Sequence, residues 1–114
     1  MSILRKIRDA LAPRRRSDPP IELHDSGFSV DGRDVAWGRV IEIRAYKLDL
    51  YTYDEIRFSF LLDSGCSMEI SEEQPGFTAF VAAMTARFPS TSDWHSRVSQ
   101  PAFARNETVL FPFV

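Results

Sequence analysis

The sequence has few of the residues from which disulfides, metal sites and phosphate-binding loops are built. Of its 114 residues one is cysteine, Cys66, and two are histidine. A single cysteine excludes an intramolecular disulfide, and with two histidines it cannot complete a four-ligand zinc site of cysteine and histidine. The five glycines have the spacing of neither nucleotide-binding loop. We therefore expect no metal, no small-molecule cofactor and no nucleic-acid partner.

Long hydrophobic runs are also missing. Ile3-Leu4 is followed at once by Arg5-Lys6, whereas a secretory signal needs about 7 to 15 apolar residues in a row. No later segment approaches the roughly 20 apolar residues of a membrane span. The sequence therefore predicts a cytoplasmic protein.

The composition is that of one folded domain with a charged appendage. Hydrophobic residues make up 44% and charged residues 26% of the chain, which is typical of a globular domain and too apolar for a disordered one. The net charge of −2 conceals an asymmetry, because residues 1–16 carry six basic residues and one acidic residue, a net charge of +5. Residues 17–114 carry eight basic and fifteen acidic residues, a net charge of −7. We call residues 1–16 the basic arm.

The basic arm has the pattern of a short amphipathic helix with a linker after it. Its apolar stripe consists of Ile3, Leu4, Ile7 and Leu11, and its basic residues are Arg5, Lys6, Arg8, Arg14, Arg15 and Arg16. Pro13 ends the helix, and Pro19-Pro20 favours an extended chain. We therefore predict a basic helix and linker at 1–19 and a single α+β domain at 20–114.

Three roles are open to the basic arm. Apolar area and positive charge together favour weak binding to an anionic membrane, or to an acidic partner. The arm can also dock on the acidic remainder of the chain, or have no fixed structure.

Alternating apolar and polar residues predict an antiparallel arrangement of six to seven strands. The segments with this pattern are 21–24, 28–30, 33–37, 41–48, 56–62, 66–70 and 108–113. Asp31-Gly32 is the best tight-turn signal, and Asp63-Ser64-Gly65 predicts a second hairpin. Pro112 favours an edge position for the C-terminal strand.

One main amphipathic helix follows the strands. Its apolar residues recur with helical spacing, which requires a partner surface such as the apolar face of the sheet. They are Phe77, Phe80, Val81, Met84 and Phe88. Ser71 and Gln74 have the spacing of a capping box at its start, and Pro89 ends it. Trp94 and Val98 predict a short second helix.

The segment Leu61 to Ser67 resembles the active-site turn of retroviral-type aspartic proteases. The resemblance implies that Asp63 is one of a pair of carboxylates sharing a proton. The chain departs from that family because no later pair of hydrophobic residues is followed by glycine. A hairpin turn is the stronger interpretation of Asp63-Ser64-Gly65, and an aspartic-type hydrolase is the further alternative.

The cysteine and the histidines give no catalytic signature. Cys66 has no histidine close to it in the sequence, and it stands where a strand's first inward residue is expected. We therefore predict that Cys66 is a small core residue. His24 and His95 have polar neighbours and are predicted at the surface.

The connection between two predicted strands is the best candidate for partner binding. Charged and phenolic side chains of equal parity can point the same way at a hairpin tip, and aromatic residues on a polar background are typical binding anchors. The candidate residues are Tyr46, Lys47, Asp49, Tyr51, Tyr53 and Asp54. The competing interpretation is that these tyrosines only flank a turn.

Two family resemblances appear in the motifs. The order Gly27-Phe28, Gly32, Trp37, Val40 and Ile43, with a later helix, resembles bacterial pleckstrin-homology-like domains. This resemblance implies a bent antiparallel sheet with a helix packed over it. The segment Ser90 to Val114 extends beyond that pattern.

A second set of residues resembles a family of small bacterial proteins, over about Phe28 to Leu110. The set is Trp37, Ala45, Lys47, Asp49, Thr52, Asp54, Ile56, Phe88-Pro89, Trp94, Pro101-Ala102-Phe103 and Asn106. This resemblance implies no particular activity. We therefore predict a non-enzymatic domain that binds an unknown protein partner, with peripheral membrane or lipid binding through the basic arm as the alternative.

Overall fold

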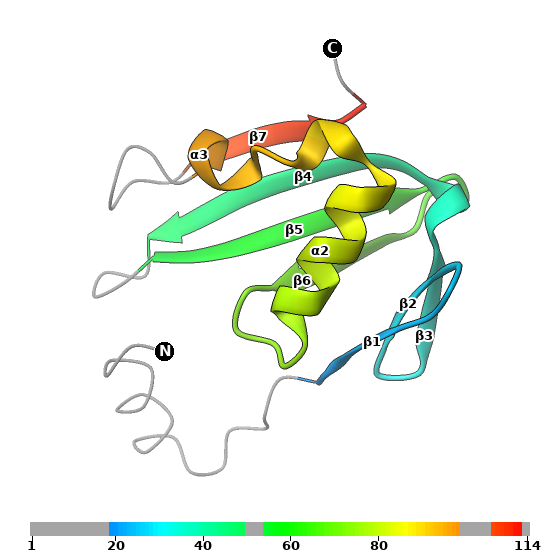
Figure 1. Ribbon diagram of the computed structural model, residues 1–114. Helices are drawn as coiled ribbons and strands as arrows, with labels where there is room; N and C mark the ends of the chain where they lie inside the picture. Colours follow the sequence, from blue (N-terminus) through cyan, green and yellow to red (C-terminus); the bar gives the residue numbers. More distant parts are fainter. Residues whose placement is uncertain (1–18, 50–53, 99–105, 113–114) are drawn as a thin grey trace, which may run out of the picture.

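The computed structural model describes residues 19–49, 54–98 and 106–112. In this part of the chain, seven strands and two α-helices form an α+β fold (Figure 1), which confirms the predicted class. The strands are β1 (Ile21–Leu23), β2 (Gly27–Val30), β3 (Arg33–Ala36), β4 (Val40–Asp49), β5 (Asp54–Leu62), β6 (Ser67–Ser71) and β7 (Asn106–Phe111). The helices are α2 (Phe77–Arg87) and α3 (Trp94–Val98), with 3-10 turns at Trp37–Arg39 and Pro89–Thr91.

The strands are divided between two antiparallel sheets and do not form the single, strongly bent sheet of six to seven strands that the resemblance to pleckstrin-homology-like domains implies. The first has the order β1-β2-β3, and the second has the order β6-β5-β4-β7. The division falls at Trp37, where the predicted strand 33–37 ends one residue early and a 3-10 turn begins. The turn follows the complete ladder between β2 and β3, and after it β4 starts a new ladder with β5.

The three-stranded sheet depends on two positions with special backbone requirements. Asp31 (φ 53°) and Gly32 (φ 79°) both have positive φ angles, as a two-residue hairpin turn requires. The predicted Asp31-Gly32 turn is therefore confirmed. At Gly27 a Cβ atom would collide with the carbonyl oxygen of Val35 on the neighbouring strand, so only glycine permits this close approach.

The four-stranded sheet has two chemically different faces. The side chains of Ile43, Ala45, Lys47, Ile56, Phe58, Phe60, Met68 and Ile70 form what we call the covered face, which lies toward the helices (Figure 1). The alternate positions form the open face, away from the helices. They are Glu42, Arg44, Tyr46, Leu48, Glu55, Arg57, Ser59, Leu61, Ser67, Glu69, Ser71, Glu107 and Val109.

An aromatic cluster joins the covered face to both α2 and the three-stranded sheet. The ring centroids of Phe28 and Phe60 are 5.4 Å apart, and each lies within 5.6 Å of Phe80 on α2. Trp37 packs against the same three rings and against Phe88. The predicted apolar stripe of the main helix is confirmed, since Phe80, Met84 and Phe88 are buried.

The predicted capping residues Ser71 and Gln74 form hydrogen bonds in the turn that precedes α2, and not at the first residue of the helix. The Ser71 backbone N–H donates to Gln74 Oε1 (2.7 Å), and the Glu73 N–H donates to Ser71 Oγ (3.1 Å). These bonds close the turn after β6, whereas α2 begins at Phe77 after Gly76. Gly76 has φ 89°, and a Cβ there would lie 2.7 Å from the Ile21 carbonyl oxygen.

Side chains donate hydrogen bonds to backbone carbonyls on both outer strands of the four-stranded sheet. On β7, Ser90 Oγ donates to the Leu110 carbonyl (2.8 Å), and Arg97 Nη2 donates to the Val109 carbonyl (2.7 Å). On β6, Arg33 Nη2 donates to the Ser67 carbonyl (3.3 Å). The predicted edge position of the C-terminal strand is thus confirmed, and its edge is partly protected from pairing with other chains.

Candidate functional site

The structure separates the residues that were predicted to form one binding tip. Tyr46 and Lys47 are neighbours on β4 and therefore point to opposite faces of the sheet. Lys47 is 1% exposed on the covered face, with its Nζ 3.6 Å from Asp54 Oδ2. The prediction that Lys47 presents an exposed charge is wrong, because β4 runs on to Asp49 and keeps position 47 within the sheet. Tyr51, Tyr53 and the side chain of Asp49 lie outside the described residues, and their role stays a prediction.

All residues of the basic arm also lie outside the described residues. Their predicted helix and their membrane or partner contacts stay predictions. In the part that the structure does describe, no helix is both long and apolar enough to cross a membrane.

Asp63 lies in a hairpin turn, as the stronger interpretation predicts. Gly65 has φ 90°, and its N–H donates to the Leu62 carbonyl (2.9 Å). Arg39 Nε donates to Asp63 Oδ1 (3.0 Å), and both side chains are exposed. Aspartic-type chemistry needs a second carboxylate beside the first, whereas the described group that bonds Asp63 is a guanidinium.

Cys66 is exposed, so its predicted place in the core is wrong. The turn takes in one residue more than the alternation suggests. Because β6 begins at Ser67, the inward series starts with Met68. His24 is exposed, as predicted.

His24 lies beside a serine and an acid in the three-stranded sheet, which is a constellation worth testing for nucleophilic catalysis. Its Nε2 is 3.1 Å from Ser29 Oγ and 3.5 Å from Asp34 Oδ1. In a catalytic triad the acid holds the other ring nitrogen and so orients the base. Here both contacts fall on Nε2, so Asp34 cannot play that role in this arrangement.

The open face of the four-stranded sheet carries the most extensive polar network among the described residues. At the β7 side, Arg44 donates from Nε to Glu42 Oε2 (2.6 Å) and from Nη1 to Glu107 Oε2 (2.9 Å). Arg44 thus connects β4 with β7. The hydrogen bonds to Glu42 and then to Glu107 raise the pKa of Arg44 above its usual value.

A second chain of bonds crosses β4, β5 and β6. The Tyr46 hydroxyl donates to Glu69 Oε2 (2.7 Å), and Arg57 Nη1 lies 3.4 Å from Glu69 Oε1. Arg57 Nε also donates to Glu55 Oε2 (3.0 Å), which accepts a bond from Ser71 Oγ (2.6 Å). Burial raises the pKa of Tyr46, and its bond to the Glu69 carboxylate raises that pKa further. The phenol therefore stays protonated and donating at neutral pH.

The open face is hollowed and carries a net negative charge. Its four carboxylates and two guanidiniums leave two net negative charges. A hollow of about 350 Å³ lies among Arg44, Tyr46, Leu48, Ser59, Glu69 and Glu107. The side chains of Glu69 and Glu107 are 50% and 47% exposed, so their charge is accessible to a partner.

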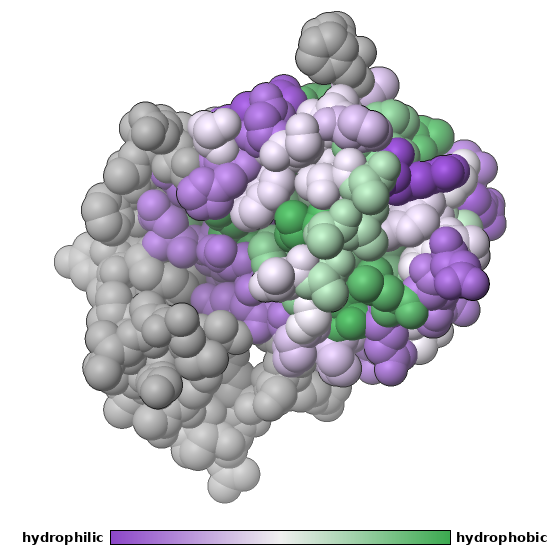
Figure 2. Space-filling model, viewed as in Figure 1, coloured by the Kyte–Doolittle hydropathy of each residue, from purple (hydrophilic) through white to green (hydrophobic). Residues whose placement is uncertain are grey.

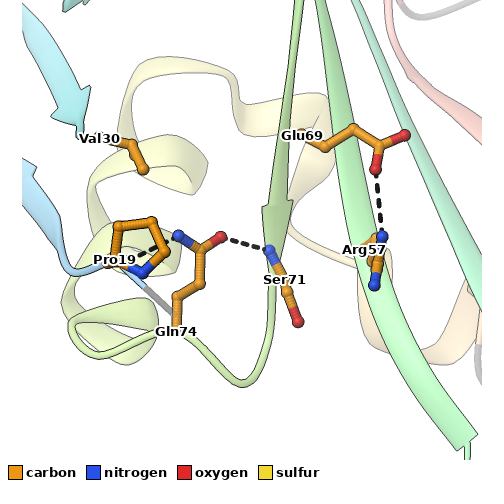
Figure 3. Close-up of a pocket in the computed structure, with 6 residues that line it drawn as sticks. All are labelled: Pro19, Val30, Arg57, Glu69, Ser71 and Gln74. Carbon is orange, nitrogen blue, oxygen red and sulfur yellow. Dashed lines mark hydrogen bonds and ion pairs between the residues drawn. The ribbon is translucent and has the colours of Figure 1, made fainter. Parts of the chain in front are cut away.

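A smaller hollow continues from the open face to the point where the described chain begins. It has a volume of about 220 Å³ and is lined by Pro19, Val30, Arg57, Glu69, Ser71 and Gln74 (Figure 3). The buried Gln74 side chain bridges its walls, because Nε2 donates to the Pro19 carbonyl (2.7 Å) while Oε1 accepts from the Ser71 N–H (2.7 Å). Glu69 lines both hollows, so they form one continuous surface.

Sequence reasoning did not find this network, although part of the signal was present. Glu42, Arg44 and Tyr46 have one parity on β4, and that parity marks the polar side of the strand. The pairing of these residues with Glu69 and Glu107 depends on the order β6-β5-β4-β7, which parity within one strand does not reveal. Among the residues described, no group of histidine, cysteine and carboxylates has the geometry of a metal site.

Comparison of the chain with models of known protein families, with curated proteins and with solved structures finds no match.

Proposed function

We propose that this chain is a protein-interaction domain that binds its partner through the open face of the four-stranded sheet. The observation that carries the proposal is the set of charged and phenolic side chains held in fixed positions around the 350 Å³ hollow. Side chains that are already ordered lose less conformational entropy on binding. Tyrosine and arginine are also the residue types most enriched among interface anchors.

The chemistry of the open face supports a partner with basic or hydrogen-bond-donating side chains. Glu69 and Glu107 supply exposed carboxylates at the rim of the hollow. Leu48 and Val109 add apolar area on the same face. A polar rim around a partly apolar centre is the usual anatomy of a non-obligate interface.

Another uncovered surface is the outer side of α2, which serves as the control. Figure 2 shows weakly apolar side chains running down the middle of the helix side of the molecule. From Phe77 to Ala86, α2 contains no charged residue. The small side chains of Ala82 and Ala86 are exposed there.

The test is affinity capture from a lysate of the source organism, with the captured proteins quantified by mass spectrometry. We expect Arg44→Ser with Tyr46→Ser to lose the partner that the unmodified chain captures. The matched control, Ala82→Ser with Ala86→Ser, should retain it. Retention by the Arg44 and Tyr46 variant with loss by the control would place the interface on α2 and contradict the proposal.

The hairpin tip is examined in the same experiment. A variant with Tyr51→Ala and Tyr53→Ala distinguishes the tip from the open face. If this variant captures every partner, the two tyrosines are not part of the interface.

We further propose that the resemblance to pleckstrin-homology-like domains extends to the architecture. Two antiparallel sheets meet at Trp37, and α2 packs on both through Phe28 and Phe60. This arrangement supports the proposal because the resemblance implies strands bent around a packed helix. An experimental structure in which the strands do not bend around α2 would contradict this proposal.

A further inference from the structure

We propose that the basic arm binds in cis to the open face, with Arg14, Arg15 and Arg16 lying across the acidic side chains of that face. The part of this inference that concerns regulation rests on the proposed function. The docking itself does not, because it follows from where the chain enters the domain, from charge and from reach.

The chain enters the domain at the edge of the open face. The first described residue, Pro19, lines the smaller hollow on the side opposite Arg57 and Glu69 (Figure 3). Its carbonyl is held by Gln74, which is only 8% exposed. The three arginines are therefore attached three to five residues from the open face, at a fixed point.

The charges of the two parts are complementary. The basic arm carries a net charge of +5, and residues 17–114 carry −7. On the open face, Glu69 near the entry point and Glu107 on the far strand are about half exposed. Arg44 and Arg57 already bond these carboxylates, but each carboxylate keeps an exposed side that a guanidinium can approach.

The segment is long enough to cross the sheet. An extended chain advances about 3.3 Å per residue, so Arg16 to Arg14 reach roughly 10 to 17 Å from Pro19. The outer strands of a four-stranded sheet are about 14 Å apart. Pro19-Pro20 favours an extended backbone at this point, so the arginines can reach from β6 toward Glu107 on β7.

A tethered segment is a strong competitor for its own surface. Short flexible tethers give effective concentrations in the millimolar range. A partner that uses the open face must then displace the arginines. The arm would reduce partner binding at low salt, and this reduction would weaken as salt screens the exposed charges.

The test uses the full chain, labelled with ¹⁵N, and compares amide signals of the open face between two charge-matched variants. One variant has Arg14→Ser, Arg15→Ser and Arg16→Ser. The other has Arg5→Ser, Lys6→Ser and Arg8→Ser. We expect the first to shift the signals of Tyr46, Glu69 and Glu107, and the second to leave them near their original positions.

Two further conditions sharpen the test. Raising sodium chloride should move the signals of the unmodified chain toward those of the Arg14, Arg15 and Arg16 variant. In a chain with Glu69→Gln and Glu107→Gln, the same three arginine substitutions should cause no further shift. The carboxylate control, Asp25→Asn in the connection between β1 and β2 with Asp34→Asn on β3, should preserve the arginine-dependent shift.

The proposal is overturned if the signals of the open face do not respond to Arg14→Ser, Arg15→Ser and Arg16→Ser. It is also overturned if the arm binds vesicles of phosphatidylglycerol and phosphatidylcholine and the amide signals of the open face are the same with and without vesicles. Capture experiments separate this failure from failure of the proposed function. Loss of capture by the Arg44 and Tyr46 variant would keep the interface on the open face even if the arm does not dock there.

Discussion

The two faces of the four-stranded sheet are built from the same strands and have opposite chemistry. On β5, Phe58 and Phe60 are fully buried on the covered face, whereas the alternating residues Arg57 and Ser59 point to the open face. Burial of aromatic area is the main source of folding free energy. The exposed charge pairs of the open face contribute little to stability. This difference indicates that the covered face holds the fold together, while the open face is available for recognition.

Lys47 is an exception to this chemical difference between the two faces. It is a charged residue in the covered face, beside apolar neighbours on the same strand, and its ammonium group lies next to the Asp54 carboxylate. Taking both charges out of water is costly, and their attraction offsets that cost only in part. The covered face therefore contains one buried charged side chain among its apolar residues.

The largest effect is expected from adjacent residues on opposite faces of β5. Phe60→Ala removes a ring that packs against Phe28 and Phe80, and it should lower the free energy of unfolding by about 3–5 kcal/mol. Leu61→Ala, on the open face, should cost about 1 kcal/mol or less. Urea denaturation measures both. Equal losses would contradict the comparison, and Phe60→Leu keeps the measurement possible if the alanine variant does not fold.

The next effect concerns charged residues on opposite faces of β4. Lys47→Met leaves the mostly buried Asp54 carboxylate without its ammonium neighbour, so we expect a loss of about 3 kcal/mol. Arg44→Met, three residues away on the open face, removes exposed ion pairs and should cost about 1 kcal/mol or less. Adding Asp54→Asn to Lys47→Met should recover part of the loss. Thermal and urea unfolding of the three variants would show whether burial sets the cost.

These expectations show which features the sequence predicts and which it does not. The Asp31-Gly32 turn and the apolar stripe of α2 were predictable because each depends on residues close together in the chain. The exposure of Cys66 and the burial of Lys47 were not, because each depends on where a strand ends, and a shift of one or two residues reverses the outcome. The open-face network joins Arg44 to Glu107 and Tyr46 to Glu69, contacts that require knowledge of strand order.

The smallest expected effect is a dependence of folding stability on pH, which comes from Glu72 just after β6. Burial raises the pKa of Glu72 above its ordinary value of 4.5, and this outweighs the opposing bond from the Ile56 N–H to its carboxylate. The folded state therefore binds a proton more tightly than the unfolded state. The contribution of Glu72 to stability is present below about pH 4.5 and is lost as pH rises through the raised value.

Glu72→Gln should therefore raise the melting temperature at pH 7 and have no effect near pH 3. The amide oxygen of the glutamine can still accept the bond from the Ile56 N–H. Glu72→Ala, which loses that acceptor, should be destabilising at both pH values. A melting temperature of Glu72→Gln below that of the unmodified chain at pH 7 would show that the charge is favourable where it lies.

The central claim, that the open face contacts a partner, is tested most directly by photo-crosslinking from single positions. Ser59 lies at the hollow of the open face, and Ala82 lies on the exposed side of α2. Each is replaced in turn by p-benzoyl-phenylalanine, and the chain is irradiated in a lysate of the source organism. We predict a crosslinked partner from position 59 and none from position 82. A partner crosslinked only from position 82 would contradict the account.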